Sequence, residues 1–342
     1  MPGVTINNVA KESGMSTTTV SRVLSGSDYP VNRQTRQRIL DAAEKVGYIP
    51  NMLARGLKTK VTNEIAVIVP YIYSPFYHSI VTGIEMALAK SAFNMSLHLT
   101  MHLSAPADSL VNRLVGNMVA GVIIAADSMT QSFYNVLYEL NQKNQLPVIS
   151  MDYKPKEHQF PGVYFDYFTG AKIAVEYLFD KGHSQIAFAS CPLYHETRNA
   201  RWAGVQAAYK ARGCEAIDLF VDAADNDFND FMVGVSLARK IMQSGKKYTA
   251  IATSNDTIAI GLLVGLDEQG IRVPDDISII GFDDCAYAMM TIPALTTIRI
   301  PSVEIGEMSA HMLLNTLEKR EPPTSINLEP RVIERASVKK LN

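Results

Sequence analysis

Beyond residue 62, short apolar runs repeatedly end in acids, amides and aromatic residues. Examples are Pro70-Tyr71, Asp152-Tyr153, Ser254-Asn255-Asp256 and Phe282-Asp283-Asp284. If these runs are strands of a parallel sheet, the residues gather at its carboxyl edge, where α/β proteins bind their ligands. Carboxylates and amides hydrogen-bond hydroxyl groups, and an arginine such as Arg201 supplies a fork of donors. The pattern favours a small polyhydroxylated ligand, although Asn255 and Asp256 could equally be ordinary helix caps.

Polar side chains that could contact nucleic acid lie in the first 24 residues. We predict one helix with Ile6, Val9 and Ala10 on one face, which runs to about Ser13, then a turn at Gly14 and a second helix capped by Ser16. Glycine at the turn adopts positive φ at little steric cost. The residues spaced to pack back on the first helix are Val20, Val23 and Leu24. The leading end of the second helix carries Thr17, Thr18 and Arg22. This arrangement is typical of a helix-turn-helix, which places its second helix in a DNA major groove, but an ordinary helical hairpin is the alternative.

A third predicted helix completes this N-terminal head. Asn32 caps it, and it extends from Arg33 to about Val46, with an expected buried face of Ile39, Leu40, Ala43 and Val46. Residues 1–60 hold nine lysines and arginines against four acids, a net charge of +5, which leaves −7 for the remaining 282 residues. A basic head on an acidic body is typical of a polyanion-binding module, so the head is predicted to bind double-stranded DNA.

The part of the chain that positions the strand-end residues consists of β-rich stretches alternating with helical stretches. The β-rich runs are 65–69, 95–100, 121–125, 148–151, 163–165, 186–190, 219–221, 250–253, 277–282, 296–300 and 326–328. Such alternation predicts parallel sheets covered on both faces by helices, and the number of β-rich and helical stretches is sufficient for two such sheets. We therefore predict an α/β protein with a three-helix head (1–50), a linker with a short helix (51–61) and a two-lobed, doubly wound body (62–342). The expected lobes are 62–160 with 293–322, and 161–292 with 323–338.

Composition and missing motifs argue against several classes of protein. No run approaches the ~18 to 20 apolar residues of a membrane span, and the N-terminus lacks a signal sequence, so a cytoplasmic, nucleoid-associated protein is expected. The three cysteines lie far apart, which argues against a disulfide framework or a CxxC metal site. Phosphate-binding, nucleophile-elbow and zinc-helix motifs are absent. We therefore expect no enzymatic activity, no metal and no cofactor.

Three stretches, in this order, carry a resemblance to the LacI/GalR family of bacterial repressors. They are VTINNVAKESGMSTTTVSRVLSG in the head, VPYIYSPFYHSIVTGIE after the first body strand, and IIGFDD followed by PALTTIRIP near the end. The likeness covers residues 4–336. It implies a periplasmic-binding-protein-like body and a homodimer on a palindromic operator. It also implies control by a small effector in the interlobe cleft, most often a sugar or sugar derivative. No heptad tail follows the body, so a dimer rather than a tetramer is expected.

The resemblance also implies roles for particular residues. The expected base-reading residues are Thr17, Thr18 and Arg22, and the expected phosphate contacts are Ser16, Ser21 and Asn32. In the linker, Leu57 matches the leucine that enters the minor groove and Arg55 matches a neighbouring groove contact. Further DNA contacts are expected at Thr5, Tyr48 and Asn51. Effector-binding positions of the family are matched by Arg201, Asn255 and Asp283 and, more loosely, by Phe76, Tyr77, Asp152 and Phe228. Tyr71 is expected to join them because it follows a predicted strand.

Two other interpretations stay open. A global carbon-catabolite regulator would respond to a protein corepressor instead of a sugar. A sugar-binding receptor would have similar lobes, but the head and the missing signal sequence argue against it. Ligand-induced release of DNA and ligand-induced tightening are both compatible with the sequence.

Overall fold

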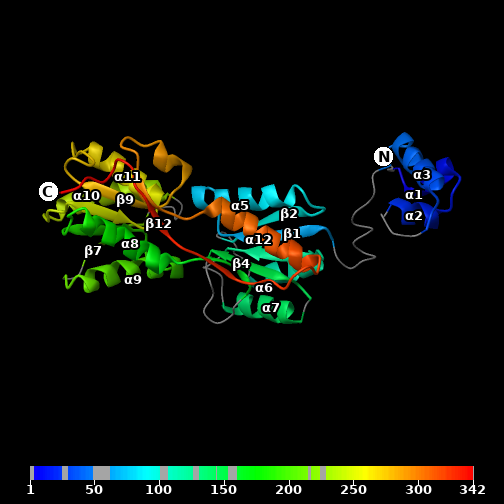
Figure 1. Cartoon of the computed structure of the whole chain (residues 1–342), viewed down its shortest axis with the longest axis horizontal. Helices are drawn as coiled ribbons and strands as arrows, with labels where there is room; N and C mark the ends of the chain where they lie inside the picture. Colours follow the sequence, from blue (N-terminus) through cyan, green and yellow to red (C-terminus); the bar gives the residue numbers. More distant parts are fainter. Residues whose placement is uncertain are drawn as a thin grey trace. The chain divides into compact units, whose positions relative to one another are not determined.

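The protein folds into two compact units, residues 1–62 and 63–342 (Figure 1). The computed structural model describes residues 4–24, 30–48, 62–100, 107–125, 131–143, 145–152, 160–214, 217–223 and 229–341. The predicted linker, residues 51–61, lies outside the described residues. Within the described part of the chain, no helix is long and apolar enough to cross a membrane.

The first unit contains the three predicted helices, α1 (Ile6–Ser13), α2 (Thr17–Leu24) and α3 (Arg33–Lys45). Gly14 ends α1 at a φ of 67°, and the Ser16 hydroxyl oxygen accepts a hydrogen bond from the Thr19 amide at 3.1 Å. The core formed by Val9, Ala10, Val20, Val23, Ile39, Ala42 and Ala43 joins the three helices. One prediction is wrong: Leu40 is 43% exposed, because Ile39, Ala42 and Ala43 share the inner face of α3 and Leu40 lies outside it.

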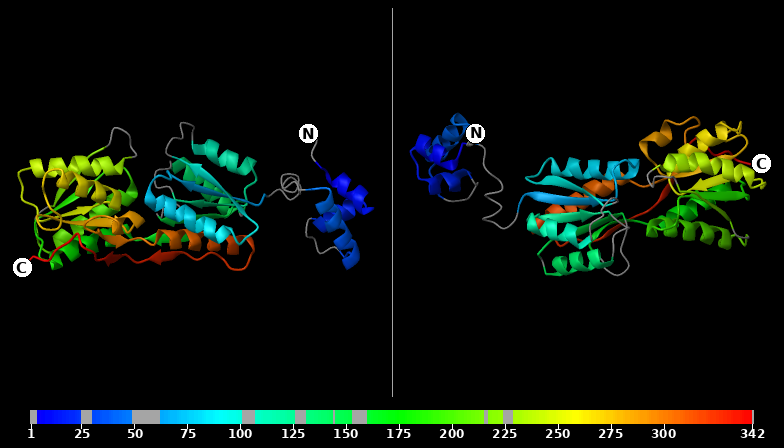
Figure 2. Two further views of the ribbon diagram at one scale, coloured as in Figure 1. Left: turned by 90° about the horizontal axis from the view of Figure 1, so that it is seen from above. Right: turned by 180° about the vertical axis from the view of Figure 1, so that it is seen from behind.

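The second unit contains two sheets. The first is parallel and has the strand order β11-β5-β4-β3-β1-β2. Its strands are β1 (Glu64–Val69), β2 (Asn94–Leu99), β3 (Gly121–Ile124), β4 (Val148–Asp152), β5 (Gly162–Phe165) and β11 (Ile326–Leu328). Helices α5 (Pro75–Leu88) and α12 (Ser302–Leu317) cover one face, and α6 (Ala107–Gly116) and α7 (Gln131–Gln142) cover the other (Figure 2). Alternate residues of β1 pack against opposite faces, so residues 65–69 form an uninterrupted apolar run.

The second sheet has the order β12-β10-β9-β8-β6-β7, and only the edge strand β12 is antiparallel. Its strands are β6 (Ile186–Ser190), β7 (Asp218–Val221), β8 (Ala250–Thr253), β9 (Ser278–Asp283), β10 (Thr296–Arg299) and β12 (Arg331–Ile333). The helices α8 (Tyr167–Asp180) and α9 (Glu196–Ala211) pack on one face, and α10 (Asp230–Gln243) and α11 (Asp256–Asp267) on the other. A 3₁₀ helix, η1 (Ala286–Met289), follows β9.

The two-lobed, doubly wound α/β body is confirmed, but the expected lobe boundaries are wrong. β5 pairs with β4 in the first sheet, whereas residues after 160 were expected in the second lobe. β10 pairs with β9 in the second sheet, and β11 pairs with β5 in the first. The chain therefore crosses between the sheets after β5, after β10 and after β11. Strand composition predicts that a segment is β, but pairing with distant strands decides which sheet it joins.

Candidate functional site

A cavity of about 400 Å³ lies at the carboxyl edges of strands from both sheets. Its wall includes Tyr71 after β1, Cys191 after β6, Asn255 after β8 and Asp283 at the end of β9. The first turns of α5, α9 and α10 complete it. Side chains from both lobes thus face one space, which is the expected location of a ligand in doubly wound sheets.

Arg201, on α9, lines the cavity and is only 8% exposed. Its guanidinium carbon lies 4.2 Å from the ring centre of Tyr167 and 4.6 Å from that of Phe282. Its Nη2 atom lies 3.7 Å from Oδ1 of Asp283. The two rings fix the plane of the guanidinium by cation–π contact, so its donors keep one orientation beside the carboxylate.

Asn255 and Asp230 form a second polar group in the cavity wall. The Asn255 Oδ1 atom caps α11 by accepting from the Ile258 amide at 2.8 Å, while Nδ2 donates to Oδ2 of Asp230 at 2.6 Å. The Cys191 thiol donates to Oδ1 of Asp230 at 3.1 Å. Burial, and then the charge of Asp230, raise the pKa of the Cys191 thiol, so it remains a protonated donor.

Aromatic side chains from the start of α5 and the preceding loop form another wall. The Tyr71 ring stacks on Tyr73 at 4.5 Å between centroids and meets Tyr77 edge-on at 5.2 Å. Phe76 contacts Tyr77 at 5.0 Å. Burial, followed by the charge of Asp230, raises the pKa of the Tyr71 hydroxyl. The wall therefore offers apolar faces together with a neutral hydroxyl, as sugar-binding surfaces require.

Six of the eight predicted effector residues line this cavity: Tyr71, Phe76, Tyr77, Arg201, Asn255 and Asp283. Asp152 ends β4, but its side chain is outside the described part of the structure, and Phe228 lies outside the described residues. The cavity is also lined by Tyr167, Arg198 and Asp230, which were not predicted from the sequence. Their positions in the sequence could have identified them as cavity residues. Each lies in the first turn of a helix that follows a strand, and such turns border the carboxyl edge of the sheet.

The predicted DNA contacts in the head lie on α2 or near the ends of the three helices. Thr17, Thr18 and Arg22 are exposed on its surface. Ser16 and Asn32 are also exposed, and each uses its side-chain oxygen to cap a helix. Thr5 donates from its amide and hydroxyl to Oδ1 of Asn8, whereas Ser21 and Tyr48 are half-buried. Asn51, Arg55 and Leu57 lie outside the described residues.

Comparison with known proteins supports this organisation. Residues 5–51 match the family described as bacterial regulatory proteins, lacI family, and residues 175–338 match a periplasmic binding protein-like domain. The chain is 32% identical over 332 residues to catabolite control protein A of Priestia megaterium, covering 97% of this chain and 98% of that protein.

Two solved structures show the same architecture. A lac repressor dimer bound to operator and an anti-inducer is 25% identical, with a TM-score of 0.83 over 98% of this chain and 99% of that one. A LacI-family regulator from Enterococcus faecalis with bound ribose is 28% identical, with a TM-score of 0.71 over 82% of this chain and all of that one. With its helix-turn-helix head and its two-lobed ligand-binding body, this chain belongs to the LacI family of bacterial regulatory proteins.

Proposed function

We propose that this protein is a transcriptional repressor that binds a palindromic operator as a homodimer and is controlled by a neutral sugar in the cavity. The observation that carries the proposal is the buried Arg201, held by Tyr167 and Phe282 beside the Asp283 carboxylate. An arginine donor and a carboxylate acceptor side by side can bind neighbouring hydroxyl groups through charge-assisted hydrogen bonds.

The charges of the cavity support a neutral ligand. Its described wall carries two arginines, Arg198 and Arg201, and two aspartates, Asp230 and Asp283. These charges balance, so the ligand need not bring a compensating charge. The buried Thr100 hydroxyl on the wall has no hydrogen-bond partner among the described residues, which leaves it available to a polar ligand. The ribose-bound relative supports a sugar as the chemical class.

The head supports the operator as the second partner. Thr17, Thr18 and Arg22 present donors and acceptors from the exposed surface of α2, as base reading in a major groove requires. Ser16, Ser21 and Asn32 are proposed phosphate contacts, with Thr5 and Tyr48 beside them. In the linker, Asn51, Arg55 and Leu57 remain proposed contacts on the strength of the family resemblance.

The experiment measures operator affinity with and without sugar. An operator is first selected from a random duplex library, and its affinity is then measured by fluorescence anisotropy with D-ribose, D-glucose, cellobiose or their phosphates present. We expect a neutral sugar to change the affinity. Asp283→Ala should abolish that response and leave the ligand-free operator affinity unchanged, because Asp283 belongs to the cavity and not to the head.

The matched control is Asp267→Ala, which removes an exposed aspartate at the end of α11. It should keep the full response. A response only to sugar phosphates would contradict the neutral-ligand proposal. A normal response in Asp283→Ala would place the ligand elsewhere.

A further inference from the structure

The turn that presents Asp283 to the cavity has an unusual backbone conformation. Asp283 has a φ of 127° and Asp284 a φ of 58°, and neither residue is glycine. Positive φ is sterically unfavourable for side chains with a Cβ atom, and two such residues in succession persist only where their surroundings hold them. The contacts around the turn therefore decide where the Asp283 carboxylate lies.

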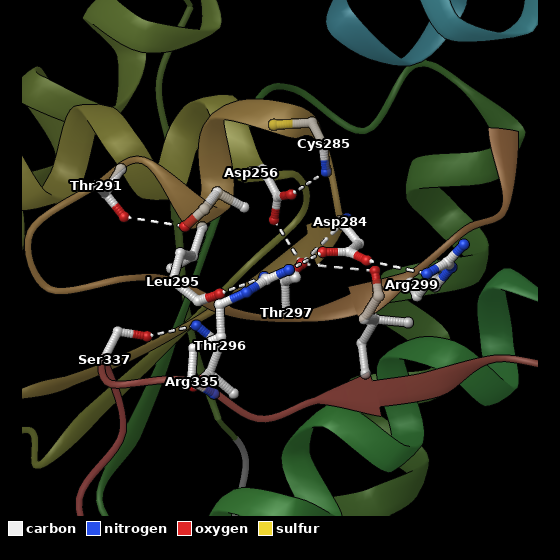
Figure 3. A network of polar contacts seen from close by, with 12 residues as sticks. Asp256, Asp284, Cys285, Thr291, Leu295, Thr296, Thr297, Arg299, Arg335 and Ser337 are labelled. Atoms are coloured by element: carbon white, nitrogen blue, oxygen red, sulfur yellow. Dashed lines mark hydrogen bonds and ion pairs between the residues drawn. The ribbon is translucent and has the colours of Figure 1, made fainter. Parts of the chain in front are cut away.

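Asp256 and Thr297 hold the two residues that follow Asp283 (Figure 3). The Cys285 amide donates to Oδ2 of Asp256 at 2.8 Å, and the Thr297 hydroxyl donates to Oδ1 of Asp256 at 2.5 Å. The oxygen of the same hydroxyl accepts from the Asp284 amide at 3.4 Å. Asp256 and Thr297 are fully buried, so water does not compete for these hydrogen bonds.

Two arginines, Arg335 and Arg299, hold the Asp284 side chain. Arg335 donates from Nη2 to Oδ1 of Asp284 at 2.5 Å, and its Nη1 donates to the Leu295 carbonyl at 2.8 Å (Figure 3). Nη1 of Arg299 lies 3.9 Å from Oδ2 of Asp284. The Asp284 carboxylate therefore points away from the cavity, while that of its neighbour Asp283 points into it.

Asp256 also links the turn to a second cavity residue. It directly follows Asn255, which faces the cavity from the start of α11. Its carboxylate lies so close to β9 that a Cβ atom on Gly281 would be 2.2 Å from Oδ1. One buried side chain thus fixes the start of α11 against the end of β9, and with it the spacing between Asn255 and Asp283.

We propose that Asp256 and Thr297 are positioning residues, which hold the Asp283–Asp284 turn so that the Asp283 carboxylate faces Arg201 and the ligand. The ligand-binding part of this inference rests on the proposed function. The positioning part concerns the turn itself, so it can be tested without a ligand. A turn released from both residues could return to negative φ, which would rotate the Asp283 side chain away from Arg201.

The test compares Thr297→Val with Thr297→Ser in the full chain. Valine keeps the shape of threonine but removes the hydroxyl, whereas serine keeps it. Amide hydrogen exchange at Asp284 and Cys285 should rise about tenfold in Thr297→Val, as expected for the loss of a hydrogen bond, and should stay near the wild-type rate in Thr297→Ser. Exchange in α8 and α9 should not change, which separates a local effect from general destabilisation.

Isothermal titration with D-ribose supplies the second measurement. If the wild type binds D-ribose, Thr297→Val should weaken that binding about tenfold at unchanged operator affinity. A wild type that does not bind D-ribose counts against this sugar as the effector, and the exchange rates still decide the positioning role. Unchanged exchange at Asp284 and Cys285, or an equal rise throughout the body, would overturn the inference.

Discussion

Arg201 depends on the planar shape of its guanidinium as much as on its charge. It lies over the Tyr167 and Phe282 rings while one nitrogen faces Asp283. A lysine ammonium would keep the charge, but it is not planar and cannot maintain the same ring contacts and forked donors.

Arg201→Lys should therefore lose most of the ligand response, with a decrease in affinity of about tenfold or more, since charge-assisted hydrogen bonds contribute ~1.5 to 3 kcal/mol. Titration calorimetry with the responsive sugar measures the loss. The control is Arg212→Lys. Arg212 directly follows α9, the helix that carries Arg201, and forms a surface ion pair with Asp180, so this variant should bind like the wild type. Equal affinity in Arg201→Lys would show that charge alone suffices.

Arg22 is the head residue whose side chain best suits base recognition. If it makes a bidentate contact with a guanine, Arg22→Ala should lose ~1 to 3 kcal/mol of discrimination between operator and random duplex. Competition anisotropy at constant salt gives this ratio. Arg33→Ala, at the exposed start of α3, should weaken binding to both duplexes equally. Retained discrimination in Arg22→Ala would remove Arg22 from the base-reading set.

His183 makes the stability of the body depend on pH. Its side chain is buried, with Nε2 2.9 Å from the Lys339 carbonyl oxygen and Nδ1 3.1 Å from the Thr249 hydroxyl. Burial lowers the pKa of His183, and the contact with the Lys339 carbonyl partly opposes this shift. The unfolded chain therefore binds the proton more readily, so the free energy of unfolding falls as pH drops below about 6.5.

His183→Gln should reduce that loss, because glutamine can donate to Lys339 but does not titrate. Urea unfolding of the wild type and the variant at about pH 7.5 and about pH 5.5 measures it. His311→Gln, at an exposed position on α12, should keep the wild-type dependence. Identical pH dependence in His183→Gln and the wild type would exclude His183 as the cause.

At the scale of elements, glycines let neighbouring helices pack closely on one another. A Cβ atom on Gly83 of α5 would lie 2.1 Å from the Val303 carbonyl oxygen of α12, and one on Gly306 would lie 2.1 Å from that of Ile80. Gly204 of α9 meets α8 in the same way, and Gly261 of α11 meets α10. Backbone lies directly against backbone, so no side-chain rearrangement can make room for a methyl group.

Gly306→Ala should therefore destabilise the body by ~1 to 3 kcal/mol, although alanine is the better helix former. Chemical denaturation measures the change. Gly116→Ala in α6 is the control, since a Cβ atom there meets nothing within 4 Å. A Gly306→Ala variant as stable as the wild type would mean that α5 and α12 can move apart at little cost.

At the scale of the whole molecule, an exposed apolar cluster supports the proposed homodimer. Tyr287, Met289, Met290 and Ile292, within and after η1, are 56%, 63%, 68% and 97% exposed. Adjacent large apolar side chains on a surface typically mark an association site. Ile292→Lys should shift the protein toward monomer in sedimentation equilibrium, and it should weaken operator binding, because each half-site would then be bound independently.

Val115→Lys serves as the control, because Val115 is 50% exposed on α6, away from this cluster. It should sediment like the wild type. Unchanged association in Ile292→Lys would show that copies of the chain meet through another surface.

The sequence by itself determined the head and nearly every strand. Gly14, Ser16 and Asn32 set the turn and two helix starts through local backbone preference and capping, which need only neighbouring residues. Tyr71, Asn255 and Asp283 could be named because strand ends identify one edge of a sheet. The helical residues Phe76, Tyr77 and Arg201 were assigned to the effector site by the family resemblance.

Only the tertiary structure decided which sheet β5, β10 and β11 join, since that depends on pairing between strands far apart in sequence. The tertiary structure likewise decided the different roles of two adjacent residues. Asn255 faces the cavity, whereas Asp256 holds the turn after β9. Adjacent polar residues give equal signals in a sequence. Their roles diverge only when residues 29 and 41 positions away, Cys285 and Thr297, are brought against one of them.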